Sequence, residues 1–149
     1  TRYSGVTGVQ TCALPIYVLD ERLAEDSHPV HLLPLCELRL MDDANYPWLV
    51  LVPRVAGVRE LIDLAADQRR ALSDETDLAL GLLQQGFRPH KLNVAALGNL
   101  VPQLHVHVIA RFEDDPAWPA PVWGRVAARP YTPEALVERI AALQALLPR

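Results

Sequence analysis

The sequence predicts an α+β domain in which a small antiparallel sheet packs against one long helix and a C-terminal helix. Two observations support this fold class. Strand patterns lie both before and after a single long helical pattern, and short turns join neighbouring strands as in hairpins. The chain has 149 residues, half of them apolar. We therefore expect residues 17–149 to form a single domain with a substantial core.

The first sixteen residues differ from the rest of the chain. They show no hydrophobic period, and the run Val6–Ile16, VTGVQTCALPI, looks like the translation of a widely used sequencing adapter. We expect residues 1–16 to be an artefactual leader. Cys12 falls inside it, which leaves Cys36 alone, so we expect no disulfide framework. Nothing resembles a signal peptide or a membrane span, and a cytoplasmic protein is the expectation.

The region before residue 54 contains two clear strands. Tyr17–Leu23 fits a strand or a short helix equally well, and the proline-punctuated stretch after it, with His28 and His31, is expected to be loop. Leu35–Met41 alternates between apolar and charged residues, which predicts a strand. Trp48–Val52 is a continuous apolar run, as in a strand buried on both faces. The short polar turn between them predicts an antiparallel hairpin.

One long helix is predicted from about Ala66 to Gln85, with Gly86 as its stop. One or two helical turns are expected just before it, over residues 57–64. The charged residues of the helix are interpreted as a solvated face; they are Arg69, Arg70, Asp74 and Glu75.

The second half begins with two more predicted strands, Lys91–Leu97 and Leu104–Phe112, separated by a turn at Gly98-Asn99. Residues 113–124 are too irregular for an element and too apolar for disorder. Their tryptophans, Trp118 and Trp123, are expected in the core or an interface, and stacking on adenine is the alternative. Thr132 as N-cap and Pro133 at the first helical position open a final amphipathic helix over about 132–147.

The polar face of one strand carries the chemistry that the sequence suggests. In residues 103–109, QLHVHVI, side chains alternate, so Gln103, His105 and His107 point one way and apolar side chains the other. Two imidazoles two positions apart form a compact group that can attack, bind a phosphate or hold a metal.

Two plainer interpretations of these histidines stay open. Histidines on a strand face can be structural, with their nitrogens satisfied by neighbouring carbonyls. A His-x-His pair can bind a metal, which would need a third ligand such as Cys36 or Asp42, although no cysteine pair or HExxH motif supports this. The formal charge of -4 argues against nucleic-acid binding, which needs a basic footprint.

The stretch Asn93–Arg111, NVAALGNLVPQLHVHVIAR, resembles the signature of the histidine triad (HIT) superfamily of nucleotide hydrolases and transferases. That motif reads His-φ-His-φ-His-φ-φ, where φ is apolar. Gln103 stands in the place of the first histidine, His105 in the place of the second and His107 in the place of the third. The resemblance covers roughly Tyr17–Arg111 and implies a HIT-like fold and a homodimer. We expect no metal or other cofactor.

The resemblance also implies a mechanism. His105 would attack the α-phosphorus of a (di)nucleoside polyphosphate or related nucleotide and form a nucleotidyl-histidine intermediate that water resolves. His107 would hydrogen-bond phosphate oxygens and, when protonated, would help to neutralise charge in the transition state. Gln103 replaces a titratable group that supports the nucleophile or protonates the leaving group. A phosphoanhydride, whose leaving group is acidic, is therefore favoured over a phosphoramidate.

Further site residues follow from the same resemblance. Asn93 and Asn99 would lie around the phosphate and the leaving group, and Gly98 would let the backbone approach the phosphate. Asp42 or Asp43 would hold the ribose hydroxyls. Trp48 stands where many members have another histidine. The alternative function is a nucleotide-binding module whose triad has decayed at Gln103.

Overall fold

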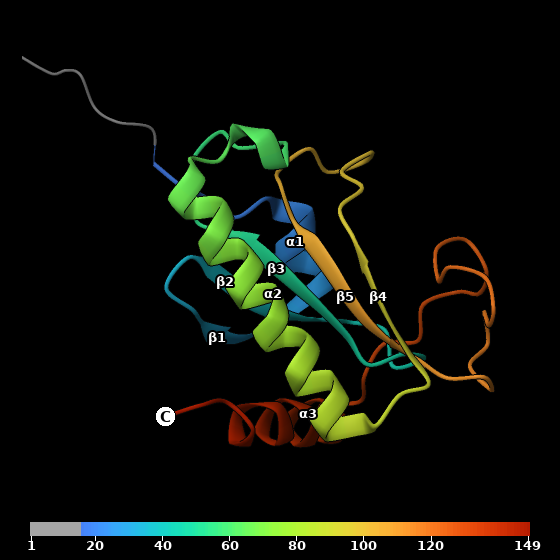
Figure 1. Cartoon of the computed structure of the whole chain (residues 1–149). Helices are drawn as coiled ribbons and strands as arrows, with labels where there is room; N and C mark the ends of the chain where they lie inside the picture. The colour runs from blue at the N-terminus through green and yellow to red at the C-terminus, as the bar shows by residue number, and fades with distance from the viewer. Residues whose placement is uncertain (1–15) are drawn as a thin grey trace, which may run out of the picture.

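A computed structural model describes residues 16–149, so all of the expected leader except Ile16 lies outside the described residues. The strands form one antiparallel sheet in the order β1-β2-β3-β5-β4 (Figure 1). They are β1 (Ser27–Leu32), β2 (Cys36–Met41), β3 (Trp48–Pro53), β4 (Lys91–Ala95) and β5 (Val106–Arg111). The helices are α1 (Glu21–Asp26), a 3₁₀ turn η1 (Leu61–Asp63), α2 (Ala66–Phe87) and α3 (Pro133–Ala145).

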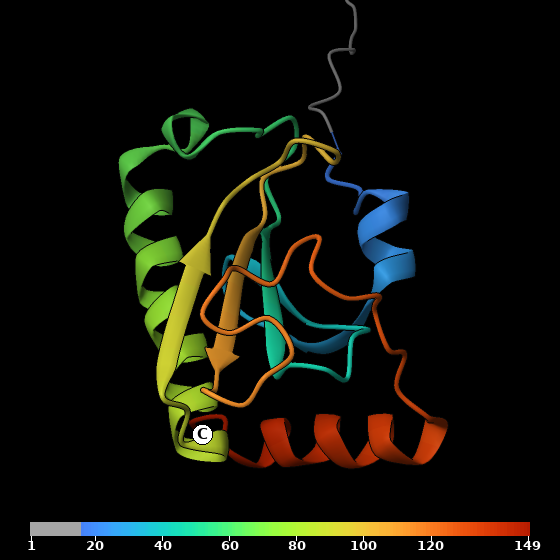
Figure 2. The ribbon, with the colours of Figure 1, turned by 90° about the vertical axis from the view of Figure 1, so that its right-hand side faces the viewer.

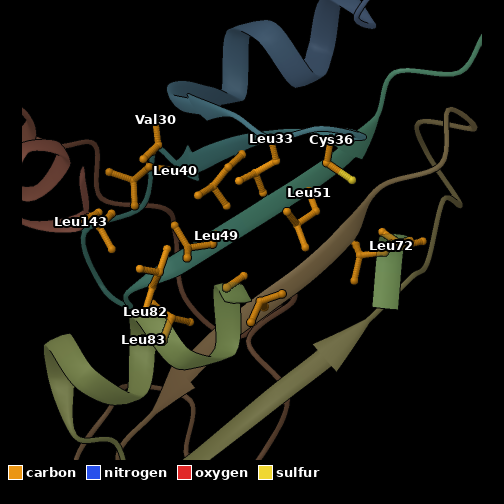
Figure 3. Close-up of a cluster of buried hydrophobic side chains, with 14 of the residues drawn as sticks. Val30, Leu33, Cys36, Leu40, Leu49, Leu51, Leu72, Leu82, Leu83 and Leu143 are labelled. Carbon is orange, nitrogen blue, oxygen red and sulfur yellow. The ribbon is translucent and has the colours of Figure 1, made fainter. Parts of the chain in front are cut away.

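One face of the sheet carries the larger core. Figure 3 shows leucines of β2 and β3, among them Leu40 and Leu49, gathered with Leu82 of α2 and Leu143 of α3. Alternation along each strand sends these side chains to one face, where the apolar stripe of α2 covers them. The α+β class and the long helix expected from the sequence are thereby confirmed.

The opposite face carries a second, smaller core and the candidate site. Figure 2 shows α2 and α1 on opposite sides of the strands, with the irregular segment after β5 on the side of α1. The second core is formed by Leu23, Tyr46, Trp48, Val50, Val52, Ile109, Ala117 and Val122. Residues 113–124 therefore contribute Ala117 and Val122 to this core. The two tryptophans expected there are not part of it, because Trp118 is half-buried and Trp123 is exposed.

The hairpin of β2 and β3 is confirmed, with Cys36 opposite Pro53 and Leu40 opposite Leu49. β5 lies between β3 and β4 and pairs antiparallel with both. β3 is buried along its whole length, as the unbroken apolar run predicts. The central pair of strands, β3 and β5, fixes the positions of the side chains of the candidate site.

The expected loop at residues 27–32 is wrong, because this segment forms β1. It pairs with β2 through an irregularity between Pro29 and His31. β1 is the outer strand of the sheet, where a proline without an N–H is tolerated, so the proline signal marks an edge here and not a loop. The open choice over residues 17–23 resolves into a short helix, α1, which begins at Glu21 after the cap Asp20.

The predicted stop of the long helix is also wrong. α2 continues through Gly86 to Phe87, and Arg88 takes the left-handed conformation with φ of 48°. A Cβ at Gly86 would lie 3.1 Å from Cδ1 of Leu146, so this glycine admits the segment after α3 close to the helix. Gly86 therefore allows close packing against Leu146 and does not end the helix.

Glu75 departs from the solvated face expected for α2. It is buried, and its two carboxylate oxygens accept from the backbone N–H groups of Leu35 and Cys36, both at 2.8 Å. The charge is thereby satisfied in a position that fixes the turn between β1 and β2 against α2. Cys36 itself is a free, buried residue, as expected.

The C-terminal helix is confirmed. The hydroxyl of Thr132 accepts from the N–H of Ala135 at 3.2 Å, and Pro133 occupies the first turn. Gln144 on α3 donates to the carbonyl of Val30, which ties the helix to the edge strand β1. Within residues 16–149, no helix combines the length and the apolar character needed to cross a membrane.

Candidate functional site

The two histidines of the motif lie side by side on the face of the sheet covered by α1 and residues 112–131. His107 is in β5, opposite Val50 of β3 and Ala95 of β4, and His105 immediately precedes β5. Their ring centroids are 5.0 Å apart. Both are buried, at 6% and 4% exposure for His105 and His107. The strand expected from Leu104 begins only at Val106, so His107 alone lies within it, and the segment just before the strand brings His105 beside His107.

His105 has its protonation pattern set by the backbone. Its Nδ1 lies 2.7 Å from the carbonyl oxygen of Gln103. A carbonyl can only accept, so Nδ1 of the neutral ring carries the proton and Nε2 keeps a free lone pair. The ring therefore presents a nucleophilic nitrogen without needing a separate base.

His107 has the opposite pattern. The indole Nε1–H of Trp48 donates to Nδ1 of His107 at 3.0 Å. Because an indole N–H only donates, Nδ1 is unprotonated and Nε2 carries the hydrogen. Burial, together with the neighbouring His105, lowers the pKa of His107 from 6.5 to about 4. The imidazole is neutral near pH 7 and offers an N–H donor.

A cavity of about 310 Å³ opens beside His105. It lies between the loop that carries η1 and the loop after β4, and Gly98 and Leu104 are among its lining residues. Gly98 has φ of +71°, a conformation that favours glycine, and a Cβ there would lie 3.5 Å from the carbonyl oxygen of Val101. The turn that the sequence predicts at Gly98 thus borders the nucleophile.

Comparison with known proteins identifies this arrangement. The family model described as the HIT domain matches residues 22–114, more than half of the chain. The chain belongs to the HIT family. The family expected from the motif is confirmed, and so is its fold.

Solved histidine triad proteins resemble nearly the whole described chain. One from Bradyrhizobium japonicum is 44% identical, has a TM-score of 0.86 and covers 88% of this chain and 98% of its own. One from Marinobacter aquaeolei VT8 is 46% identical, with a TM-score of 0.86 and coverages of 89% and 96%. One from Sinorhizobium meliloti 1021 is 44% identical, with a TM-score of 0.86 and coverages of 88% and 97%. The comparison with curated protein sequences finds no match.

Gln103, in the first position of the HIT motif, binds the N-terminal segment through its side chain. Its Oε1 accepts from the N–H of Asp20 at 2.8 Å, and its Nε2 donates to the carbonyl of Val18 at 2.9 Å. The contact with His105 comes from the backbone carbonyl of Gln103 and not from its amide. The residue therefore serves the nucleophile through its main chain and holds residues 18–20 with its side chain.

The two asparagines of the HIT signature have different surroundings. Asn93 is half-buried on β4, and its Oδ1 accepts from the guanidinium of Arg111 at 2.9 Å. Arg111 is itself buried and donates through Nε and Nη2 to Asp115 at 2.8 and 3.1 Å. Asn99 is exposed in the loop that carries Gly98. Neither asparagine is among the residues that line the cavity beside His105.

Asp42 and Asp43 lie at a second cavity, of about 410 Å³, which Trp48 and Trp123 also line. Asp42 accepts from the N–H of Tyr131 at 3.0 Å and lies 3.2 Å from Nε2 of His28. Asp43 accepts from the N–H groups of Asn45 and Arg129. Neither carboxylate is among the residues that line the cavity beside His105, and Trp48 links their cavity to His107.

The described residues 16–149 contain no cluster of three or more His, Cys, Asp or Glu side chains that could hold a metal ion. Cys36 and Asp42, considered as third ligands for the histidine pair, belong to other surroundings. Cys36 lies in the core beneath α2, and Asp42 lies at the second cavity. Neither of these two residues therefore joins His105 and His107 as a third metal ligand.

Two tryptophans around His107 have roles that the sequence analysis did not assign. Trp48 donates a hydrogen bond to the imidazole of His107, and Trp123 lies edge-on to that imidazole at a centroid distance of 5.1 Å. The sequence did contain a signal for Trp48. It lies two residues before Val50, and therefore on the same face of the strand that pairs with the motif strand. Assigning the contact requires the register that sets Trp48 opposite Ile109, which the sequence alone leaves open.

Proposed function

We propose that this HIT protein cleaves a nucleoside phosphoanhydride, such as a dinucleoside polyphosphate, at its α-phosphate through a nucleotidyl-histidine intermediate on His105. The observation that best supports this is the pair of opposed protonation patterns. His105 offers a lone pair at Nε2, and His107 offers an N–H at the same ring position. A nucleophile beside a fixed donor is what phosphoryl substitution requires.

The reaction follows from these two rings. Nε2 of His105 forms a bond to the α-phosphorus, and the bond from that phosphorus to the leaving phosphate oxygen breaks, with the electron pair departing on the oxygen. The Nδ1 proton stays on the ring, and the carbonyl of Gln103 stabilises the resulting imidazolium. Water then attacks the same phosphorus and loses a proton to solvent. The P–N bond breaks and neutral His105 is restored.

The leaving group is expected to be acidic, because the site offers it no evident proton donor. Nδ1 of His107 accepts from Trp48, and the pKa of His107 is lowered to about 4, so this ring is not protonated near pH 7. The amide of Gln103 binds the backbone of residues 18–20. A phosphate leaves readily without protonation, whereas an amine does not. This favours phosphoanhydrides over phosphoramidates.

The second cavity is the proposed position of the nucleoside. Asp42 and Asp43 provide carboxylates for the ribose hydroxyls, and Trp48 and Trp123 provide aromatic surface for a base. This cavity adjoins His107 through Trp48, so a nucleoside there would direct its α-phosphate toward the two histidines. Asp42→Asn is expected to raise KM more than it lowers kcat.

A nucleotide-binding module is the second candidate, and one observation favours it. The side chain of Gln103 binds the backbone of Val18 and Asp20, and its contact with His105 comes from its backbone carbonyl. Such a module would bind purine nucleotide in calorimetry without turnover. Gln103→His would then raise the activity.

The deciding experiment measures release of mononucleotide from a panel of dinucleoside polyphosphates and adenosine phosphoramidates. Turnover of polyphosphates that is lost in His105→Ala supports the proposed enzyme. His31→Ala is the matched control, because His31 is exposed on the edge strand β1 and lines neither cavity. Near-normal activity in His105→Ala would end the proposal, and nucleotide binding without any turnover would establish the binding module.

We also propose that the protein forms a homodimer through the open edge of the sheet. β4 is an edge strand within the described sheet, and Val94 on it is 50% exposed. Exposed apolar residues continue into the next loop at Leu97 and Leu100. An apolar edge strand is a template for pairing with another chain. Light scattering should find a dimer for the wild type and a monomer for Val94→Lys; a monomeric wild type would contradict the proposal.

A further inference from the structure

We propose that Trp48 is a positioning residue that holds His107 as a neutral imidazole with its hydrogen on Nε2. Its catalytic consequence rests on the proposed function, but the protonation pattern itself does not. The neighbour that contacts Nδ1 of His107 is one that only donates. An indole N–H has no lone pair to offer and cannot act as an acceptor.

The indole is held firmly in place. Trp48 is 5% exposed and sits opposite Ile109 in the register of β3 and β5. Tyr46 contacts it edge-on at a centroid distance of 6.2 Å, and Trp123 does so at 5.7 Å. Its Nε1 is thereby aimed at Nδ1 of His107 along a buried hydrogen bond of 3.0 Å.

Every other protonation state of His107 is disfavoured by this geometry. A hydrogen on Nδ1 would face the indole N–H and leave two donors opposed. A protonated ring would add a charge in a buried position, and burial and His105 already lower the pKa of the ring. The cross-strand neighbours Val50 and Ala95 bring no compensating carboxylate. The neutral ring with Nε2–H remains.

The consequence is a division of labour between the two histidines. His107 donates a hydrogen bond through Nε2 and keeps its proton, so it stabilises phosphate charge without acting as a general acid. The resemblance implies that His107 hydrogen-bonds phosphate oxygens and, when protonated, also helps to neutralise charge. In this chain the fixed donor is a neutral imidazole, and Trp48 is the residue that keeps it so.

Nitrogen-15 NMR of the histidine side chains tests the proposal without any substrate. The wild type should show His107 with hydrogen on Nε2 only, unchanged between pH 7 and pH 5, and a coupling across the hydrogen bond from Nε1 of Trp48 to Nδ1 of His107. In Trp48→Phe, the ring should show a mixture of both neutral forms, and the pKa of His107 should rise by about one, because a bond to the neutral form has been removed. Trp118→Phe is the matched control, since the ring of Trp118 lies edge-on to His90 and donates no hydrogen bond to His107.

The outcomes separate the inference from the proposed function. A wild-type His107 with hydrogen on Nδ1, or a spectrum that Trp48→Phe leaves unchanged, would overturn the inference. If Trp48→Phe does not fold, the coupling between the two nitrogens in the wild type still decides, because its absence contradicts the bond. If His107 carries hydrogen on Nε2 only but the protein turns over no nucleotide, the inference is supported while the proposed function fails. If turnover is found, the acid side of the pH profile of kcat should move to higher pH in Trp48→Phe and stay in place in Trp118→Phe.

Discussion

Nε1 of Trp48 lies 3.0 Å from Nδ1 of His107, within a buried hydrogen bond that joins the first residue of β3 to the motif strand β5. The ring of His105 lies beside it and is fixed from the other direction, by a backbone carbonyl. Two imidazoles of the same chemistry thus present a lone pair and a hydrogen at equivalent positions. The protein environment, and not the motif alone, makes them different.

The lowered pKa of His107 predicts a pH dependence of stability. The unfolded chain binds a proton at this residue near pH 6.5, whereas the folded chain does so only near pH 4. Stability is therefore full above the unfolded pKa and is lost as the pH falls from about 6.5 toward 4. Between pH 7 and pH 5 the loss from this residue should reach about 2 kcal/mol.

Urea unfolding at the two pH values measures this loss in the wild type and in His107→Asn. Asparagine keeps an acceptor near the position of Nδ1 but does not titrate. The variant should lose less stability than the wild type on acidification. An equal loss in both proteins would show that His107 does not carry the effect.

Gln103→Ala is expected to lower the free energy of unfolding by about 2 kcal/mol, because it removes two hydrogen bonds to the backbone of Val18 and Asp20. Chemical denaturation measures the change. Asn99→Ala is the control, because that exposed residue of the same loop should change stability by less than about 0.5 kcal/mol. A neutral Gln103→Ala would mean that the amide does not hold the N-terminal segment.

Asp115→Ala is expected to cost about 3 kcal/mol or more, because it leaves the buried guanidinium of Arg111 without its carboxylate. The same carboxylate also accepts from three backbone N–H groups of residues 112–118. Thermal unfolding compares it with Asp114→Ala, an exposed neighbour that should be nearly neutral. Similar melting temperatures for the two variants would contradict a structural role for the ion pair.

Periodicity predicted most of the fold. The unbroken run at Trp48–Val52 and the capped C-terminal helix carry local signals, and both elements form as expected. β1 was missed because Pro29 and His31 obscure its alternation, and an irregular edge strand depends on pairing with β2 more than on its own sequence. The burial of Glu75 was missed for a related reason, since its partners are backbone groups 39 and 40 residues away.

The candidate site was predicted only in part. The two histidines could be paired from the period of one strand, and the glycine turn beside them follows from the same local signal. The partners of Nδ1 in His107 and of the amide in Gln103 lie 59 and 83 to 85 residues away in the chain. Such contacts depend on strand register and on the path of the N-terminal segment, neither of which a local pattern determines.

Trapping the covalent intermediate tests the central claim most directly. The wild type is mixed with a dinucleoside polyphosphate, quenched in alkali to preserve the P–N bond and analysed by mass spectrometry of its peptides. We expect a nucleotidyl group on the peptide that contains His105, retained in His107→Asn at a slower rate of formation and missing in His105→Ala. A nucleotidyl group on any other residue, or turnover without an adduct at His105, would contradict the proposed mechanism.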